Sequence, residues 1–260
     1  MSADITRLDL ILRRRSTIGY ATGMTLYTFV IVALYPSFKT DASLDSFTGS
    51  TAAALFGVTS SLTSPAGWLN GNIYANFFPL ILLLLTIGYG AGALAGQDED
   101  GTLCLLAVLP RRRRDLVAQK VLAMALQALF VAAAVAVVVI AGRSFELSLD
   151  AVRVVAVSVT SLLLALDFGL LALAVGAATG SRAVALAVGT TAAAVCYLIS
   201  SLAPVVHWIR PARYASPFYW AVGADQLSRG VTAVDYLVLV AIAAVAAGGA
   251  VRLFGRLDLH

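Results

Sequence analysis

The segment GQDEDGTLCLLAVLPRRRRDLVAQK, residues 96–120, lies between two long hydrophobic stretches of the chain. It contains three consecutive acidic residues, then a short apolar run that ends at Pro110, and then four consecutive arginines. Each flanking stretch is long enough to cross a bilayer as a helix, which takes about 20 apolar residues. The segment is therefore predicted to be a loop at the membrane surface between two spanning helices.

Composition places the whole chain in the membrane class. Of its 260 residues, 60% are hydrophobic and only 12% are charged, whereas a soluble domain carries about 25% charged residues. The mean hydropathy is +0.90. We therefore expect an all-α polytopic membrane protein in which residues 1–260 form one transmembrane domain.

Six segments are long and apolar enough to be spanning helices. They are residues 17–36, 73–95, 119–141, 152–178, 183–205 and 234–253. The first is diluted by threonines and follows Arg13–Arg15, so a cleaved signal peptide is an alternative interpretation. No small-residue cleavage site follows it, which favours a span.

The positions of lysine and arginine predict the orientation. With a cytoplasmic N-terminus, most of the 18 Lys and Arg residues fall on the inner side, as the positive-inside rule requires. Both termini are then cytoplasmic. The outer segments 37–72 and 206–233 are rich in aromatic residues, which favour the headgroup layer. We expect short interfacial helices there, either as part of a gate or as a plain aromatic belt.

Small residues recur at helical spacing in two of the predicted spans. They are Gly88, Gly92 and Gly96 in the second span, and Ala172, Gly176 and Gly180 in the fourth. Spacing of four residues places small side chains on one helix face, where backbones approach closely. These positions are predicted helix-packing seams, within one subunit or between two.

Asp167 is the one ionisable residue in the middle of a predicted span. A charged Asp at a helix centre costs about 2.5–3.5 kcal/mol on insertion scales, so such a residue is a functional candidate by default. Three interpretations remain open: a hydrogen-bond partner for a neighbouring helix, a residue lining a substrate pathway, or a proton relay.

Several classes of site lack the residues they need. Cys104 and Cys196 form no CxxC pair, and His207 and His260 are far apart, so zinc, haem and iron–sulfur sites have no ligand set. No HExxH or GxSxG motif is present. The net charge of +4 reflects arginines placed by topology, so we expect no nucleic-acid partner.

The apolar run at residues 102–109 is long enough for two helical turns. The preceding acids suit the positive end of a helix dipole, and Pro110 disfavours helix at the residue before it. A short helix that is apolar on most sides must be shielded from water, either by lipid headgroups or by another protein. The arginines would bind anionic lipid. An anionic lipid surface would, however, repel the three acidic residues before the run, which favours a protein partner.

This loop resembles that of the ABC-2 type permeases of ATP-binding-cassette transporters. The shared pattern maps onto Glu99, Gly101, Thr102, Leu103, Leu106, Pro110, Arg113 and Lys120. The basic stretch Asp9–Ser16 and the sequence SPFYWAVGADQLSRG before the last span also look like that family. The run of four arginines and Cys104 depart from its usual pattern.

The resemblance implies specific roles for individual residues. In the family this loop carries a cytoplasmic coupling helix, between spans two and three, that docks on an ATPase subunit. Coupling is thereby assigned to Asp98, Glu99, Asp100, Gly101, Thr102, Leu103, Leu106, Pro110 and Arg113. Apart from the resemblance, we place on the substrate pathway Asp167, as the ionisable residue within a span, and Tyr219 and Trp220 of the outer aromatic segment.

The resemblance also implies a function. The chain would be the permease subunit of a bacterial exporter in the cytoplasmic membrane, moving a lipophilic or amphipathic substrate, such as a drug, by alternating access. No G-x-x-x-x-G-K-[ST] loop occurs in the sequence. ATP and Mg²⁺ would therefore be held by a separate ATPase subunit, in two copies, and a second permease chain would complete a homodimer or heterodimer. An ion-coupled secondary transporter using Asp167 and a membrane scaffold or assembly protein are the alternatives.

Overall fold

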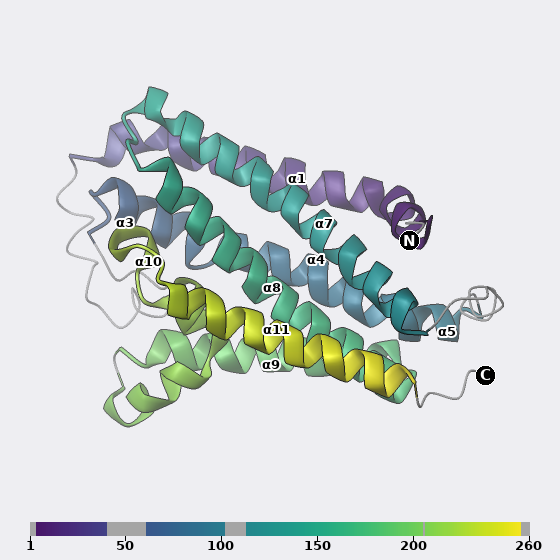
Figure 1. The fold of residues 1–260 in the computed structure, drawn as a ribbon. Coiled ribbons are helices and arrows are strands. Elements are labelled where there is room, and N and C mark those ends of the chain that lie inside the picture. Colours follow the sequence, from purple (N-terminus) through teal and green to yellow (C-terminus); the bar gives the residue numbers. More distant parts are fainter. Residues whose placement is uncertain (1–3, 41–60, 102–112, 205, 256–260) are drawn as a thin grey trace.

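The computed structural model describes residues 4–40, 61–101, 113–204 and 206–255 of the chain. Within these ranges the backbone forms helices joined by turns, and no strand is present. Six helical segments are long and apolar enough to cross a membrane, which confirms the predicted all-α, six-span architecture. Figure 1 shows them running side by side in one bundle.

Six long helices make up most of the bundle. They are α1 (Asp4–Phe38), α4 (Phe77–Ala91), α7 (Arg113–Ala141), α8 (Ala151–Thr179), α9 (Arg182–Leu202) and α11 (Ala233–Phe254). Shorter elements, in which η marks a 3₁₀- or π-helix, extend or connect them. These are α3 (Pro65–Leu69), η2 (Asn70–Tyr74), η3 (Gly92–Gly96), α5 (Gln97–Glu99), η4 (Gly142–Phe145), η5 (His207–Ala215), η6 (Tyr219–Gly223) and α10 (Gln226–Arg229).

The two ends of the bundle carry different elements. α1 begins and α11 ends at one end, beside α5 and the start of α7, and we call this the terminal end (Figure 1). α3 and α10 lie at the opposite end, the far end, where α9 also leads into η5. We call the segment 96–120 the charged loop. Its start therefore lies at the terminal end, and the short helices of the two aromatic segments lie at the far end.

α1 starts well before the predicted first span. It is continuous from Asp4, so the basic stretch expected to precede the span forms the first turns of the same helix. Leucine and arginine, which dominate Leu8–Arg15, are strong helix formers, and the membrane-length criterion alone does not detect a charged extension of a helix.

α8 lies at the centre of the bundle and packs against α4, α7, α9 and α11, while α1 packs mainly on α7. α4 and α8 approach most closely at Gly90 and Gly169, where a Cβ on Gly90 would lie 2.1 Å from the carbonyl oxygen of Gly169. The hydroxyl of Thr86 donates to the carbonyl of Ala165 at 2.6 Å. This seam requires glycine because the two backbones touch.

The predicted packing glycines lie in different surroundings. A methyl group at Gly88 would meet nothing within 4 Å, whereas at Gly92 and Gly96 it would approach arginine side chains from α1 and α9. A methyl group at Gly176 would lie 3.3 Å from Ala95, between α8 and η3. Gly88, Gly92 and Gly96 therefore meet different neighbours, and the close backbone contact with α8 lies at Gly90.

Candidate functional site

The structure describes part of the predicted coupling segment, Asp98–Gly101. Thr102, Leu103, Leu106 and Pro110 lie outside the described residues, and Arg113 is described only by its backbone, at the start of α7. Asp98 and Glu99 belong to α5, Asp100 caps it, and Gly101 follows with φ 68°. These acids therefore lie at the terminal end, directly after the second span.

Glu99 connects α5 to α9. α8 ends at Thr179 and is capped by Gly180, which has φ 64°, and α9 begins at Arg182, so the two helices are joined by a tight turn. The carboxylate of Glu99 accepts a hydrogen bond from the backbone N–H of Arg182 at 2.8 Å. An N–H in the first turn of a helix has no partner within the helix, and a carboxylate there also complements the helix dipole.

A buried polar cluster joins three helices behind this segment. Lys120 of α7 donates to Asp9 of α1 at 3.0 Å, and the Tyr89 hydroxyl of α4 donates to the same carboxylate. The guanidinium of Arg13 lies over the Tyr89 ring, 4.7 Å from its centroid. The side chains of Lys120 and Asp9 are only 1% and 7% exposed. We call Asp9, Arg13, Tyr89 and Lys120 the Asp9 cluster.

Further hydrogen bonds hold α1 along α7. The backbone N–H of Ile5 donates to the Gln119 side chain, and the Thr6 hydroxyl donates to the Gln119 carbonyl, each at 3.1 Å. Further along, the Thr17 hydroxyl donates to the Gln127 side chain at 3.2 Å. α1 is thus fixed to α7 over several turns.

The Asp9 cluster has a specific position relative to the charged loop. Tyr89 lies on the helix that leads into the loop, and Lys120 lies on the helix that leaves it. α1 therefore contacts the helix before the loop and the helix after it through one carboxylate, that of Asp9. Sequence reasoning placed Lys120 in the family motif but missed Asp9 and Tyr89. The sequence did contain one signal for this cluster, because Asp9 is the acidic residue in an otherwise basic and apolar helical stretch.

An apolar groove of about 470 Å³ runs between α4 and α9. Its walls include Leu80, Leu84 and Gly88 from α4 and Thr190 from α9. Leu80 and Leu84 are exposed although they belong to a helix that is otherwise well buried. The open face of Gly88 is thus part of a groove wall.

The residues predicted to line a substrate pathway lie outside this groove. Tyr219 and Trp220 are not among the groove-lining residues, although their neighbour Phe218 is. Asp167 is 3% exposed on α8 and also lies outside the groove lining. Neither of its carboxylate oxygens has a hydrogen-bond partner among the described residues.

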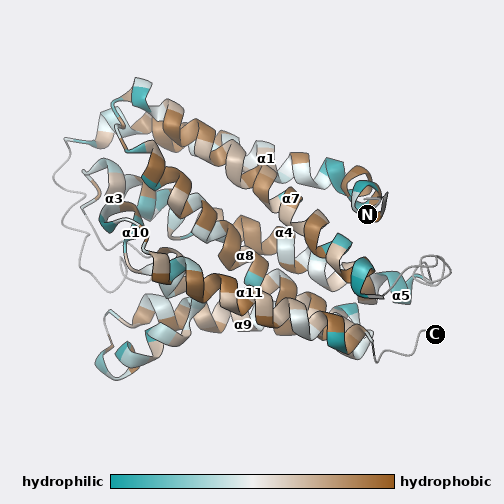
Figure 2. Ribbon diagram, viewed as in Figure 1, coloured by the Kyte–Doolittle hydropathy of each residue, from teal (hydrophilic) through white to brown (hydrophobic). Residues whose placement is uncertain are grey.

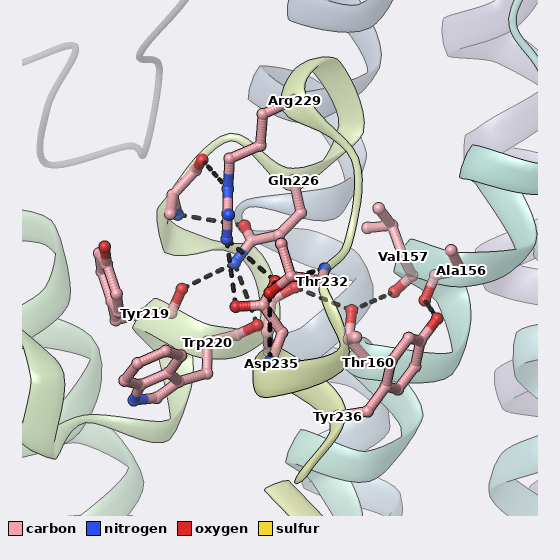
Figure 3. Close-up of polar contacts among 12 residues, drawn as sticks. Ala156, Val157, Thr160, Tyr219, Trp220, Gln226, Arg229, Thr232, Asp235 and Tyr236 are labelled. Atoms are coloured by element: carbon pink, nitrogen blue, oxygen red, sulfur yellow. Dashed lines mark hydrogen bonds and ion pairs between the residues drawn. The ribbon is translucent and has the colours of Figure 1, made fainter. Parts of the chain in front are cut away.

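A polar network fixes the far end (Figure 3). Asp235 accepts hydrogen bonds from the guanidinium of Arg229 at 3.1–3.2 Å and from the backbone N–H of Thr232 at 2.8 Å. The side chain of Gln226 donates to the carbonyls of Tyr219 and Trp220 at 2.7 and 3.0 Å. The backbone of Tyr219 and Trp220 is therefore tied to α10, and Arg229 of α10 is in turn paired with Asp235 at the start of α11.

A family model described as "ABC-2 family transporter protein" matches residues 3–259. The match extends over all six spans, the charged loop and both aromatic segments. No curated protein matches the chain.

Proposed function

Since this chain belongs to the ABC-2 family of transporter proteins, we propose that it is the permease subunit of an exporter for lipophilic or amphipathic substrates. The α4–α9 groove carries this proposal, because it is apolar, lies among the spanning helices and has room for part of such a molecule. Ligand sites are typically apolar clefts of about 300–1,000 Å³.

The energy would come from a partner. The sequence has no phosphate-binding loop of the P-loop type, so ATP and Mg²⁺ would be bound by a separate ATPase subunit. We propose a complex of two ATPase subunits and two permease chains, identical or different, in a bacterial cytoplasmic membrane. Because α5 ends and α7 begins at the terminal end, on either side of the arginine-rich stretch of the sequence, this end would face the cytoplasm by the positive-inside rule.

The contacts at the terminal end support a route for coupling. In the proposed mechanism the ATPase docks on the segment 98–113 and moves α5. α4 follows because it is continuous with η3 and α5, and α9 follows through the hydrogen bond between Glu99 and Arg182. These two helices form the walls of the groove, so movement of the loop would open or close it in alternating access.

The groove is tested by Gly88→Leu. A side chain at this position enters open space, so we expect normal folding. We also expect lipophilic-dye transport to fall more than about tenfold, because a substrate that loses about 1.4 kcal/mol or more of binding free energy in the obstructed groove binds at least tenfold more weakly. Gly248→Leu is the matched control, because Gly248 of α11 is equally open but does not line the groove. Transport would be measured in vesicles with a panel of dyes. Equal transport by the Gly88→Leu variant and the wild type excludes the groove as the pathway.

The coupling route is tested at Glu99. Glu99→Ala removes the acceptor for the Arg182 N–H and is expected to abolish transport while basal ATP hydrolysis continues, since α9 is no longer connected to α5. Glu99→Gln retains an acceptor oxygen and should preserve most of the transport. ATPase activity and dye transport would be measured on the same preparation. If both variants lose transport equally, the negative charge, and not the link to α9, is what coupling requires.

A further inference from the structure

η5 carries a strongly basic and aromatic surface that the proposed transport mechanism does not use. Within nine residues it has His207, Arg210 and Arg213, and no acidic residue occurs between Asp167 and Asp225. None of its residues is buried. Trp208 is 82% exposed, far more than is usual for a tryptophan.

η5 lies at the depth of the lipid headgroups. α9 has 21 residues, which at 1.5 Å per residue is about the 30 Å thickness of the hydrocarbon core. η5 begins within a few residues of its end. The segment that connects α9 and α11 projects from the side of the bundle at the far end, with a hydrophilic tip (Figures 1 and 2).

Arg213 and the end of η5 are held in place by contacts with neighbouring residues, whereas Arg210 is free to reach outward. The guanidinium of Arg213 lies 4.8 Å from the ring centroid of Tyr214 and 5.0 Å from that of Tyr219. The Ser216 hydroxyl donates to the carbonyl of Cys196 in α9 at 2.8 Å, which fixes the end of η5 to the spanning helix. Arg210 is exposed and makes no hydrogen bond or ion pair with any part of the chain that the structure describes.

We propose that η5 is a binding surface for an anionic phospholipid, with Arg210 and Arg213 at the headgroup phosphate and Trp208 inserted between neighbouring lipids. Arginine binds phosphate oxygens by charge-assisted hydrogen bonds, and tryptophan prefers the membrane interface. Pairing of η5 with its copy across a two-fold axis would bring like charges together, which favours lipid over a second chain as the occupant.

Trp208 reports on this contact directly. The full-length chain would be reconstituted with phosphatidylglycerol or phosphatidylcholine brominated near the top of one acyl chain, at equal mole fraction in the same background lipid. Bromine quenches only nearby tryptophans, and the Trp208 signal is the difference between the wild type and Trp208→Phe. We expect stronger quenching by the brominated phosphatidylglycerol.

The arginines determine the size of this preference. Each basic residue near an anionic surface contributes about fivefold in affinity, so Arg210→Gln should reduce the preference for phosphatidylglycerol by about that factor. Arg143→Gln, at an exposed arginine of η4 at the same end, should leave it unchanged. Equal quenching by the two lipids, or a preference unaffected by Arg210→Gln, overturns the proposal. Absence of quenching by either lipid also overturns it, since η5 would then be covered by protein.

Discussion

Asp9→Ala is expected to lower the free energy of unfolding by about 3–5 kcal/mol, because it leaves a buried charge without its partner. The ammonium of Lys120 is almost fully buried and its ion pair with Asp9 measures 2.9 Å. The same substitution removes the acceptor of the Tyr89 hydroxyl. For a chain of this length, about 2–4 °C per kcal/mol gives a fall in melting temperature of about 10 °C. Thermal unfolding of the detergent-purified protein measures it.

Asp115→Ala is the control for this prediction. Asp115 lies on the same helix as Lys120, but its pair with Arg114 is exposed and 3.7 Å long. Exposed pairs contribute about 0–1 kcal/mol, so this variant should melt close to the wild type. Equal melting temperatures for Asp9→Ala and Asp115→Ala would show that the buried pair does not hold α1 in place.

The double variant Asp9→Leu with Lys120→Met separates stability from coupling. Replacing both members of a buried pair by apolar residues of similar size is often neutral or stabilising, so most of the lost stability should return. If the Asp9 cluster also relays movement of the charged loop to α1, transport remains impaired although the melting temperature recovers. Recovery of both would give the cluster a purely structural role.

The sequence predicted the six spans because hydropathy and helix length are local properties, and TLCLLAVLPRRRR marked the charged loop by composition alone. It did not predict the Asp9 cluster, because Tyr89 and Lys120 lie 80 and 111 positions from Asp9 along the chain. Their arginine neighbours were interpreted as a topology signal only. A buried ion pair between helices depends on how the helices are arranged, which the hydropathy pattern does not contain.

The seam between α4 and α8 illustrates the same limit. The spacing of Gly88, Gly92 and Gly96 predicts small residues on one face of a helix, yet the close backbone contact with α8 lies at Gly90. Spacing identifies residues that share a face but does not say which neighbour that face meets. Gly88 instead belongs to the groove, whereas Gly92 and Gly96 face arginine side chains of α1 and α9.

Asp167→Ala is expected to stabilise the protein by about 2 kcal/mol. The carboxylate is buried in a spanning helix without a hydrogen-bond partner among the described residues, and burying it costs about 2.5–3.5 kcal/mol. The small cavity left by alanine offsets only part of this gain, at about 24 cal/mol per Å³. The melting temperature should rise by about 4–8 °C. Asp167→Asn is the matched control, because it keeps the shape and the unpaired polar atoms but removes the ionisable group, so it should melt between the wild type and Asp167→Ala.

The direction of the change decides among the three interpretations of this residue. A fall in melting temperature for Asp167→Ala would mean that the carboxylate bonds a neighbouring helix, contrary to the geometry. A rise accompanied by loss of transport would mean that the side chain is retained for function at the expense of stability. Transport would then be measured for Asp167→Asn with and without an active ATPase. A proton relay requires that Asn abolish transport, whereas a residue that only lines the pathway tolerates an uncharged amide, because the amide preserves the shape and polarity of the site.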